Sequence, residues 1–184
     1  IKRQTKMARE VADLVFVSIH WGYENTFETS FEQRRLARLI TDCGVDVIIG
    51  HHPHVLQPIE WFSREDGGKT LVIYSLGNLM SQMMRSKNML GGFVTFDIVK
   101  YGFDDPYIDN VAFIPTIFHY NYRYINGRAC KIYLYENYTE QLAAVHGVQN
   151  YASEVADYFV NLDQMKKWLT DTIKPAYLPA SVLQ

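Results

Sequence analysis

The stretch Val45–His54, VDVIIGHHPH, places three histidines directly after a short apolar run. A β-branched run that ends in a glycine is typical of a buried strand that delivers a loop to the edge of a sheet. Open α/β sheets usually bind their ligands at that edge. Because neutral imidazole is the commonest protein ligand for metal ions, the histidine cluster indicates a metal site.

The residues before this stretch predict a strand, a loop, a helix and the strand Val45–Ile49, in that order. Asp13–Ile19 is a nearly continuous apolar run, which is the pattern of a strand covered on both faces. Ser30–Gln33 matches a helix capping box, and Gly44 stands where a helix C-cap belongs. The helix between them has apolar residues at helical spacing: Leu36, Leu39, Ile40 and Cys43. Such a unit implies that the two strands are parallel neighbours in one sheet.

Two loops are therefore expected to open on the same edge of the sheet. His20 begins the first loop, His20–Glu24, as the histidine cluster begins the second. Glu24 is a candidate metal ligand, or a partner that fixes the tautomer of an imidazole, and the plain alternative is a solvated loop carboxylate. Trp21 is expected to pack or to form a pocket wall.

His52 and His54 are the favoured metal ligands within the cluster. Alternate residues point the same way on extended backbone, so these two side chains can converge on one ion. Pro53 fixes φ between them and lowers the cost of that geometry. His51 would then face the substrate or a neighbour. The alternative is a histidine-rich surface turn without chemistry.

The rest of the chain predicts more β-structure and a C-terminal helix. A hairpin turn is expected at Arg64–Gly68, and strands elsewhere: Val55–Phe62, Lys69–Ser75, Gly92–Val99, one or two within Asn110–Ile125, and Lys131–Tyr135. Asn78, after the third strand-to-loop transition, is a candidate to orient a ligand or a loop. A helix is expected within Glu154–Ile173, and residues 175–184 form a loose tail. His119 is expected to be packed in the core and His146 to lie in a loop.

Composition limits the class of protein. The 184 residues suit one domain, 1–184, whose motifs lie within residues 13–100. A net charge of -2 gives no electrostatic case for nucleic-acid binding. No apolar segment approaches the ~18 residues that a membrane span needs. Cys43 and Cys130 form no CxxC motif, and two buried thiols are favoured over a disulfide.

The motifs HWGYE (20–24), GVDVIIGHHPH (44–54), VLQP (55–58) and YSLGN (74–78) together resemble the CapA-type poly-γ-glutamate capsule synthesis proteins. That family belongs to the calcineurin-like metallophosphoesterase superfamily, and the resemblance covers about Asp13 to Leu79. It implies an α/β fold, part of a four-layer α/β/β/α sandwich around two divalent metal ions, commonly Mn, Fe or Zn. It also implies that His20, His52 and His54 are metal ligands, while Gly50-His51 fits the start of the same motif and leaves the choice between His51 and His52 open.

The early motifs of the superfamily, which supply its other metal ligands, have no counterpart before Asp13. The resemblance therefore implies that the chain is the C-terminal part of a larger domain, with an incomplete metal site and with the N-terminal half of the domain as a missing partner. Any membrane anchor would lie upstream, and the family implies a location at the cell surface.

The leading hypothesis is a metal-dependent phosphoesterase-like protein of capsule or poly-γ-glutamate biosynthesis. Its substrate would be an anionic polymer or a phosphorylated molecule, with other capsule synthesis components as partners. His51 and Glu24 are the expected catalytic residues, and Trp21 and Asn78 the expected substrate contacts. A non-catalytic surface subunit that binds or guides the polymer is the alternative hypothesis, and a purely structural histidine loop is the third.

Overall fold

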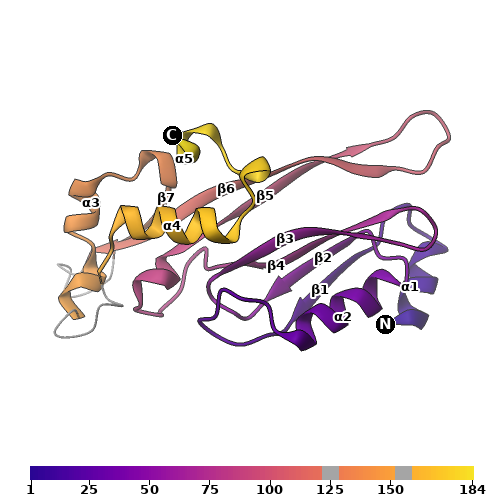
Figure 1. The fold of residues 1–184 in the computed structure, drawn as a ribbon, viewed down its shortest axis with the longest axis horizontal. Coiled ribbons are helices and arrows are strands. Elements are labelled where there is room, and N and C mark those ends of the chain that lie inside the picture. The colour runs from indigo at the N-terminus through magenta and orange to yellow at the C-terminus, as the bar shows by residue number, and fades with distance from the viewer. Residues whose placement is uncertain (122–128, 152–158) are drawn as a thin grey trace.

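The computed structural model describes residues 1–121, 129–151 and 159–184, which form two β-sheets with helices around them (Figure 1). The first sheet has the order β1-β2-β4-β3, with bounds Phe16–His20, Val47–His51, Lys69–Leu76 and Leu56–Ser63 in that order. β1, β2 and β4 are parallel, and β3 is antiparallel to β4. The second sheet is antiparallel and has the order β5-β6-β7, with bounds Leu90–Val99, Tyr107–Asn121 and Ala129–Leu134.

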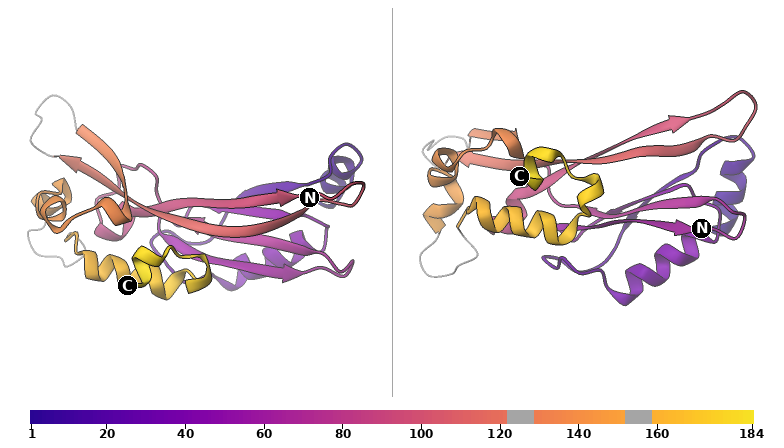
Figure 2. Two further views of the ribbon diagram at one scale, coloured as in Figure 1. Left: turned by 90° about the horizontal axis from the view of Figure 1, so that it is seen from above. Right: turned by 45° about the horizontal axis from the view of Figure 1, so that its top comes forward.

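The helix between β1 and β2 packs against a face of the first sheet, and the other helices lie towards the two ends of the molecule (Figure 1). The α-helices are α1 (Lys2–Arg9), α2 (Phe31–Thr41), α3 (Glu140–Ala144), α4 (Leu162–Thr172) and α5 (Ala180–Leu183). Short 3₁₀ segments are η1 (Ser86–Met89), η2 (Tyr135–Asn137), η3 (Gly147–Tyr151) and η5 (Pro175–Tyr177). α1 and the tip of the β5–β6 hairpin lie at one end, and α3, α4 and α5 gather towards the other (Figures 1 and 2). Within the described ranges, no helix is both long and apolar enough to cross a bilayer.

The predicted β-loop-α-β unit is confirmed. Ser30 and Gln33 form the reciprocal hydrogen bonds of a capping box at the start of α2. The helix ends at Thr41, with Asp42 as its C-cap, so Gly44 follows the cap instead of forming it; its positive φ of 81° turns the chain into β2. β1 is shorter than predicted because the Val15 N–H donates to the Asp46 carboxylate (2.7 Å) instead of to a strand neighbour.

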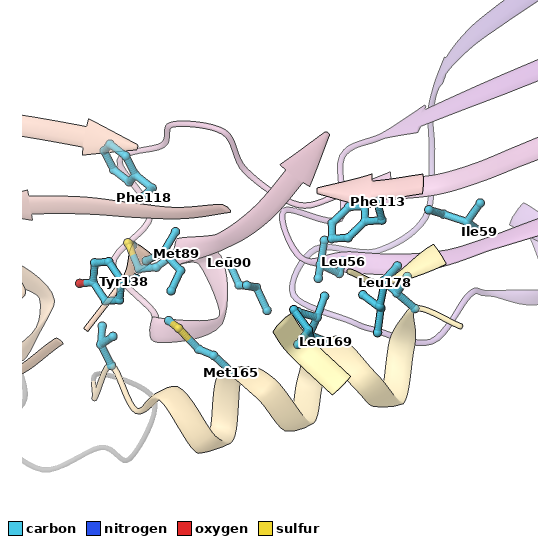
Figure 3. Packing of buried hydrophobic residues seen from close by; sticks show 14 of the residues in the cluster. Leu56, Ile59, Met89, Leu90, Phe113, Phe118, Tyr138, Met165, Leu169 and Leu178 are labelled. Carbon is cyan, nitrogen blue, oxygen red and sulfur yellow. The ribbon is translucent and has the colours of Figure 1, made fainter. Parts of the chain in front are cut away.

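Two apolar clusters cover the two faces of the first sheet. On one face, Ile40 of α2 packs with Ile48, Val72 and Tyr74. The other face belongs to a larger cluster that also contains residues of the second sheet and of α4. Figure 3 shows residues of this cluster, including Leu56, Phe113 and Leu169. The α/β class is thus confirmed, whereas a complete four-layer sandwich stays an expectation, because the C-terminal helices gather at one end of the second sheet.

Three predictions for the C-terminal part need correction or restriction. The segment 175–184 is not a loose tail, since η5 and α5 bury Leu178 and Val182 against the larger cluster. α4 begins only at Leu162, where the Asn161 side chain accepts the Gln164 N–H (2.8 Å), and residues 152–158 of the predicted helix lie outside the described residues. Within Asn110–Ile125 the chain forms one strand, β6, as far as Asn121, and residues 122–125 are likewise outside.

The two thiols are not buried as expected. Cys43 is half-buried, and Cys130 is exposed. Cys43 is a free thiol, so the two cysteines do not bridge.

His146 lies in the loop between α3 and η3, as predicted, but it is buried, with 1% of its surface exposed. Its Nε2 atom is 2.9 Å from the Phe118 carbonyl oxygen, and its Nδ1 atom accepts the Val148 N–H at 3.0 Å. These partners fix the neutral tautomer with the proton on Nε2. Burial, with a smaller effect of the neighbouring His119, lowers the pKa of His146 to about 4. His119 is buried as predicted, and its Nδ1 atom lies 2.7 Å from the Tyr138 hydroxyl.

We expect the free energy of unfolding to fall as the pH drops from about 6.5 to about 4. In this window the unfolded imidazole of His146 takes up a proton while the folded one stays neutral. The loss attributable to His146 should reach about 3 kcal/mol at most. Urea denaturation at pH 7, 5.5 and 4 would measure it. The variant His146→Gln keeps an N–H donor but cannot be protonated, so a slope as steep as that of the wild type would contradict this assignment.

Candidate metal centre

The carboxyl ends of β1, β2 and β4 meet at one edge of the first sheet, as the sequence predicts. The register places His20 directly opposite His51. The pairing continues one step beyond the strands, where the Trp21 N–H donates to the His51 carbonyl (3.1 Å). The Asn25 N–H then donates to the Pro53 carbonyl (2.7 Å) and joins the two loops.

Glu24, His52 and His54 form a cluster at this edge. One ligand atom from each residue lies within 4.8 Å of the other two. Glu24 is exposed and the two histidines are half-buried, so the cluster is open to solvent on one side. The cluster is therefore a candidate site for a metal ion, and it includes both histidines that the sequence favours as ligands.

The backbone that brings His52 and His54 together is not extended, contrary to the reasoning from the sequence. Both residues have positive φ, 102° and 58°. Non-glycine residues rarely adopt such angles, which cost roughly 1–3 kcal/mol each and are concentrated at functional sites. Hydrogen bonds from other loops hold this conformation: the Pro53 carbonyl accepts from Asn25, and the His54 carbonyl accepts from Asn78 and Asn88.

Asn78 fixes the tautomer of His54. The Asn78 Nδ2 group donates to the carbonyls of His54 (3.3 Å) and Asn88 (3.2 Å), so its Oδ1 atom must be the one that faces the His54 ring. Oδ1 lies 2.9 Å from His54 Nδ1, which therefore carries the proton. The Nε2 atom of His54 is left with a free lone pair, the state that a metal ligand requires. Asn78 itself is buried, with 8% of its surface exposed, so it contacts the His54 ring from the protein interior.

His20 lies beside this cluster and outside the three-residue set. Its ring centroid is 4.4 Å from that of His52, so the predicted proximity of these two histidines is present. His51 is exposed, and its Nε2 atom is 3.1 Å from the Ser18 hydroxyl oxygen. His20 as a ligand and His51 as a catalytic group stay predictions.

Trp21 packs against Tyr74 of β4. Its side chain is 6% exposed, stacks on Tyr74 at 5.3 Å between ring centroids, and donates from Nε1 to the Tyr74 carbonyl (3.0 Å). Gly50 makes room for this contact, since a Cβ atom there would overlap both the indole nitrogen and the Tyr74 carbonyl. The glycine before the histidines thus allows β2 and β4 to lie close together under Trp21.

Two asparagines, Asn25 and Asn88, contribute to the site and were missed from the sequence. Asn25 lies next to Glu24 with a φ of 61°, and Asn88 is a fully buried residue of η1 that contacts both Asn25 and His54. The position of Asn25 within the HWGYE loop could have suggested a turn, because asparagine tolerates positive φ. Nothing in the methionine-rich sequence around Asn88 indicates its contacts.

We expect Asn78→Ala to weaken divalent-metal binding by about 10- to 100-fold, the usual effect of losing the partner that orients a histidine ligand. The reason is that His54 could then adopt either tautomer and turn its ring. Isothermal titration with Mn²⁺ or Zn²⁺ would measure the change. Thr26→Ala serves as a control, because the Thr26 hydroxyl is exposed and, among the described residues, donates one long hydrogen bond, 3.4 Å, to the Glu24 carbonyl. An affinity of Asn78→Ala equal to that of the wild type would contradict the assignment.

Comparison with known proteins finds a family similar to the N-terminal part of the chain, which contains the cluster. Residues 1–83 match the family described as bacterial capsule synthesis protein PGA_cap. The chain is 39% identical to the PGA biosynthesis protein CapA of Bacillus subtilis (strain 168) over 95 residues, which is 52% of this chain and 24% of that protein. It is 44% identical to the capsule biosynthesis protein CapA of Bacillus anthracis over 69 residues, 38% of this chain and 16% of that protein.

A more distant relative is the uncharacterized protein y4sH of Sinorhizobium fredii (strain NBRC 101917 / NGR234), 30% identical over 118 residues, which is 61% of this chain and 22% of that protein. The chain thus spans about a quarter or less of the length of these relatives. The matched residues include Glu24, His52 and His54. Residues 1–83 are thus similar to the CapA-type capsule synthesis proteins.

Proposed function

We propose that this chain supplies the histidine-bearing part of a divalent-metal phosphoesterase-type centre that acts in capsule or poly-γ-glutamate biosynthesis. The convergence of Glu24, His52 and His54 at the carboxyl edge of a parallel sheet is the observation that carries the proposal. Such an edge is where open α/β sheets bind their ligands.

The donor atoms of the cluster fit a transition-metal ion. Two imidazoles and one carboxylate suit Zn, Mn or Fe, and Asn78 already holds His54 in the ligating tautomer. Two ligands on opposite sides of one ion, each at ~2.1 Å, lie at most ~4.2 Å apart. The separations of up to 4.8 Å are slightly wider, so a small rotation of an exposed side chain such as Glu24 brings the set to bonding distance.

The neighbouring residues have roles that follow from their positions. A metal ion at such a site would polarise a phosphoryl group and lower the pKa of bound water. His20, beside His52, is placed to extend the donor set towards a second ion. His51 is exposed at the same edge, where an imidazole can donate a proton to a leaving group, and Ser18 orients its ring. Glu24, within the donor set, is better placed as a ligand than as a base.

The pathway and its location rest on the family. The relatives are named for capsule and PGA biosynthesis, and from those names we infer an anionic polymer or a phosphorylated precursor as substrate and a place at the cell surface. The second candidate is a non-catalytic subunit that binds the polymer. It is favoured by one observation: among the described residues the cluster offers three donors, which suit one ion, whereas the superfamily's centre holds two.

Metal titration with matched variants tests the proposal. Glu24→Gln and His52→Ala should each weaken Mn²⁺ or Zn²⁺ binding by at least about tenfold, because each removes one of three ligands. Glu28→Gln, an exposed carboxylate in the same loop, should leave the affinity unchanged. Hydrolysis of bis-p-nitrophenyl phosphate by the metal-loaded protein separates the two candidates. Metal affinity that is unchanged in both Glu24→Gln and His52→Ala would contradict the site, and binding without hydrolysis would favour the polymer-binding subunit.

A further inference from the structure

Asn88 links the two loops that carry the candidate ligands. It lies in η1, is fully buried, and falls outside the family match over residues 1–83. Its Nδ2 group donates to the Asn25 side-chain oxygen (2.9 Å) and to the His54 carbonyl (3.0 Å). One amide group therefore connects the residue next to Glu24 with His54 itself.

Further hydrogen bonds connect the same segments. The Asn88 carbonyl accepts from Asn78, the residue that orients the His54 ring. The neighbouring Lys87 donates from Nζ to the Asn25 carbonyl (3.1 Å). Three loops, each following a different strand of the first sheet, thus meet at the η1 segment. The linkage acts on two residues with left-handed backbone, Asn25 beside the cluster and His54 within it.

The orientation of the Asn88 amide shows which of its atoms the structure uses. Two oxygen acceptors face Nδ2, so the nitrogen must occupy that position. The Oδ1 atom is buried and has no hydrogen-bond partner among the described residues. Buried polar atoms are usually paired, and an unpaired one reduces stability. The side chain is therefore suited to holding the loops through its two N–H groups more than to stabilising the fold.

We propose that Asn88 is a positioning residue, which holds the Glu24 and His54 loops together and so pre-organises the cluster for a divalent cation. The inference rests on the proposed metal site and adds to it a residue from outside the matched segment. Pre-organisation of the ligands lowers the ordering cost of binding, so the effect of losing Asn88 should appear in metal affinity more than in stability.

The test uses Asn88→Ala and the similarly sized Asn88→Leu, which removes the donors without adding a charge. Met89→Ala is the matched control, because Met89 is equally buried in the same segment but packs in the apolar cluster. Mn²⁺ affinity is measured by calorimetry and Tm by thermal denaturation. Both Asn88 variants should bind Mn²⁺ about 10- to 100-fold more weakly than the wild type. Met89→Ala should lower Tm and leave the affinity within about threefold.

Three results would overturn the inference: wild-type affinity in either folded Asn88 variant, an equal loss of affinity in Met89→Ala, or unchanged hydrogen exchange of the Asn25 amide in the metal-free Asn88 variants. The exchange measurement does not need the metal. If the wild type binds no Mn²⁺, the proposed metal function fails, and faster exchange at Asn25 in Asn88→Ala, but not in Met89→Ala, would still support the positioning role.

Discussion

The parallel register between β1 and β2 is the constraint on which the candidate site depends. It places His20 opposite His51 and makes both strands end at the same level, so the loops that follow them start side by side. A shift by one residue would turn every side chain of β1 to the other face. The register is held at the amino end by Asp46, whose carboxylate accepts the Val15 N–H and pairs with Arg9 and Arg64. Gly50 permits the close approach of β2 to β4 at the other end.

The two edges of the first sheet are organised differently. At the amino edge, one buried carboxylate joins α1, β1, β2 and the β3–β4 hairpin through charged hydrogen bonds. At the carboxyl edge, the uncharged amides of Asn78 and Asn88 hold the histidine loop, and Lys87 adds one charged hydrogen bond to the Asn25 carbonyl. Uncharged partners hold the histidines without competing for their lone pairs, which leaves His54 available to a cation. Two features of this arrangement reduce stability: the positive φ of His52 and His54, and the Asn88 oxygen that has no hydrogen-bond partner among the described residues.

The sequence was sufficient for those features that depend on local signals. The capping box of α2, the apolar runs of β1, β2 and β4, and the turn at Arg64–Gly68 all lie where the pattern of residues predicts them, within a few residues. The sequence was insufficient for features that depend on contacts between residues far apart in the chain. The left-handed backbone of His52 and His54 depends on amides 24 to 34 residues away. The burial of His146 depends on Phe118, and the order of residues 175–184 depends on packing of Leu178 and Val182, which no helical stripe marks in so short a segment.

Anomalous X-ray diffraction from crystals soaked in Mn²⁺ or Zn²⁺ would locate the metal ion in the cluster without reference to activity. We expect an anomalous peak bounded by Glu24, His52 Nε2 or Nδ1, and His54 Nε2, with metal–nitrogen distances of about 2.0–2.2 Å and with Asn78 Oδ1 still on His54 Nδ1. An ion coordinated elsewhere, or no peak at this edge of the sheet at saturating metal, would contradict this expectation.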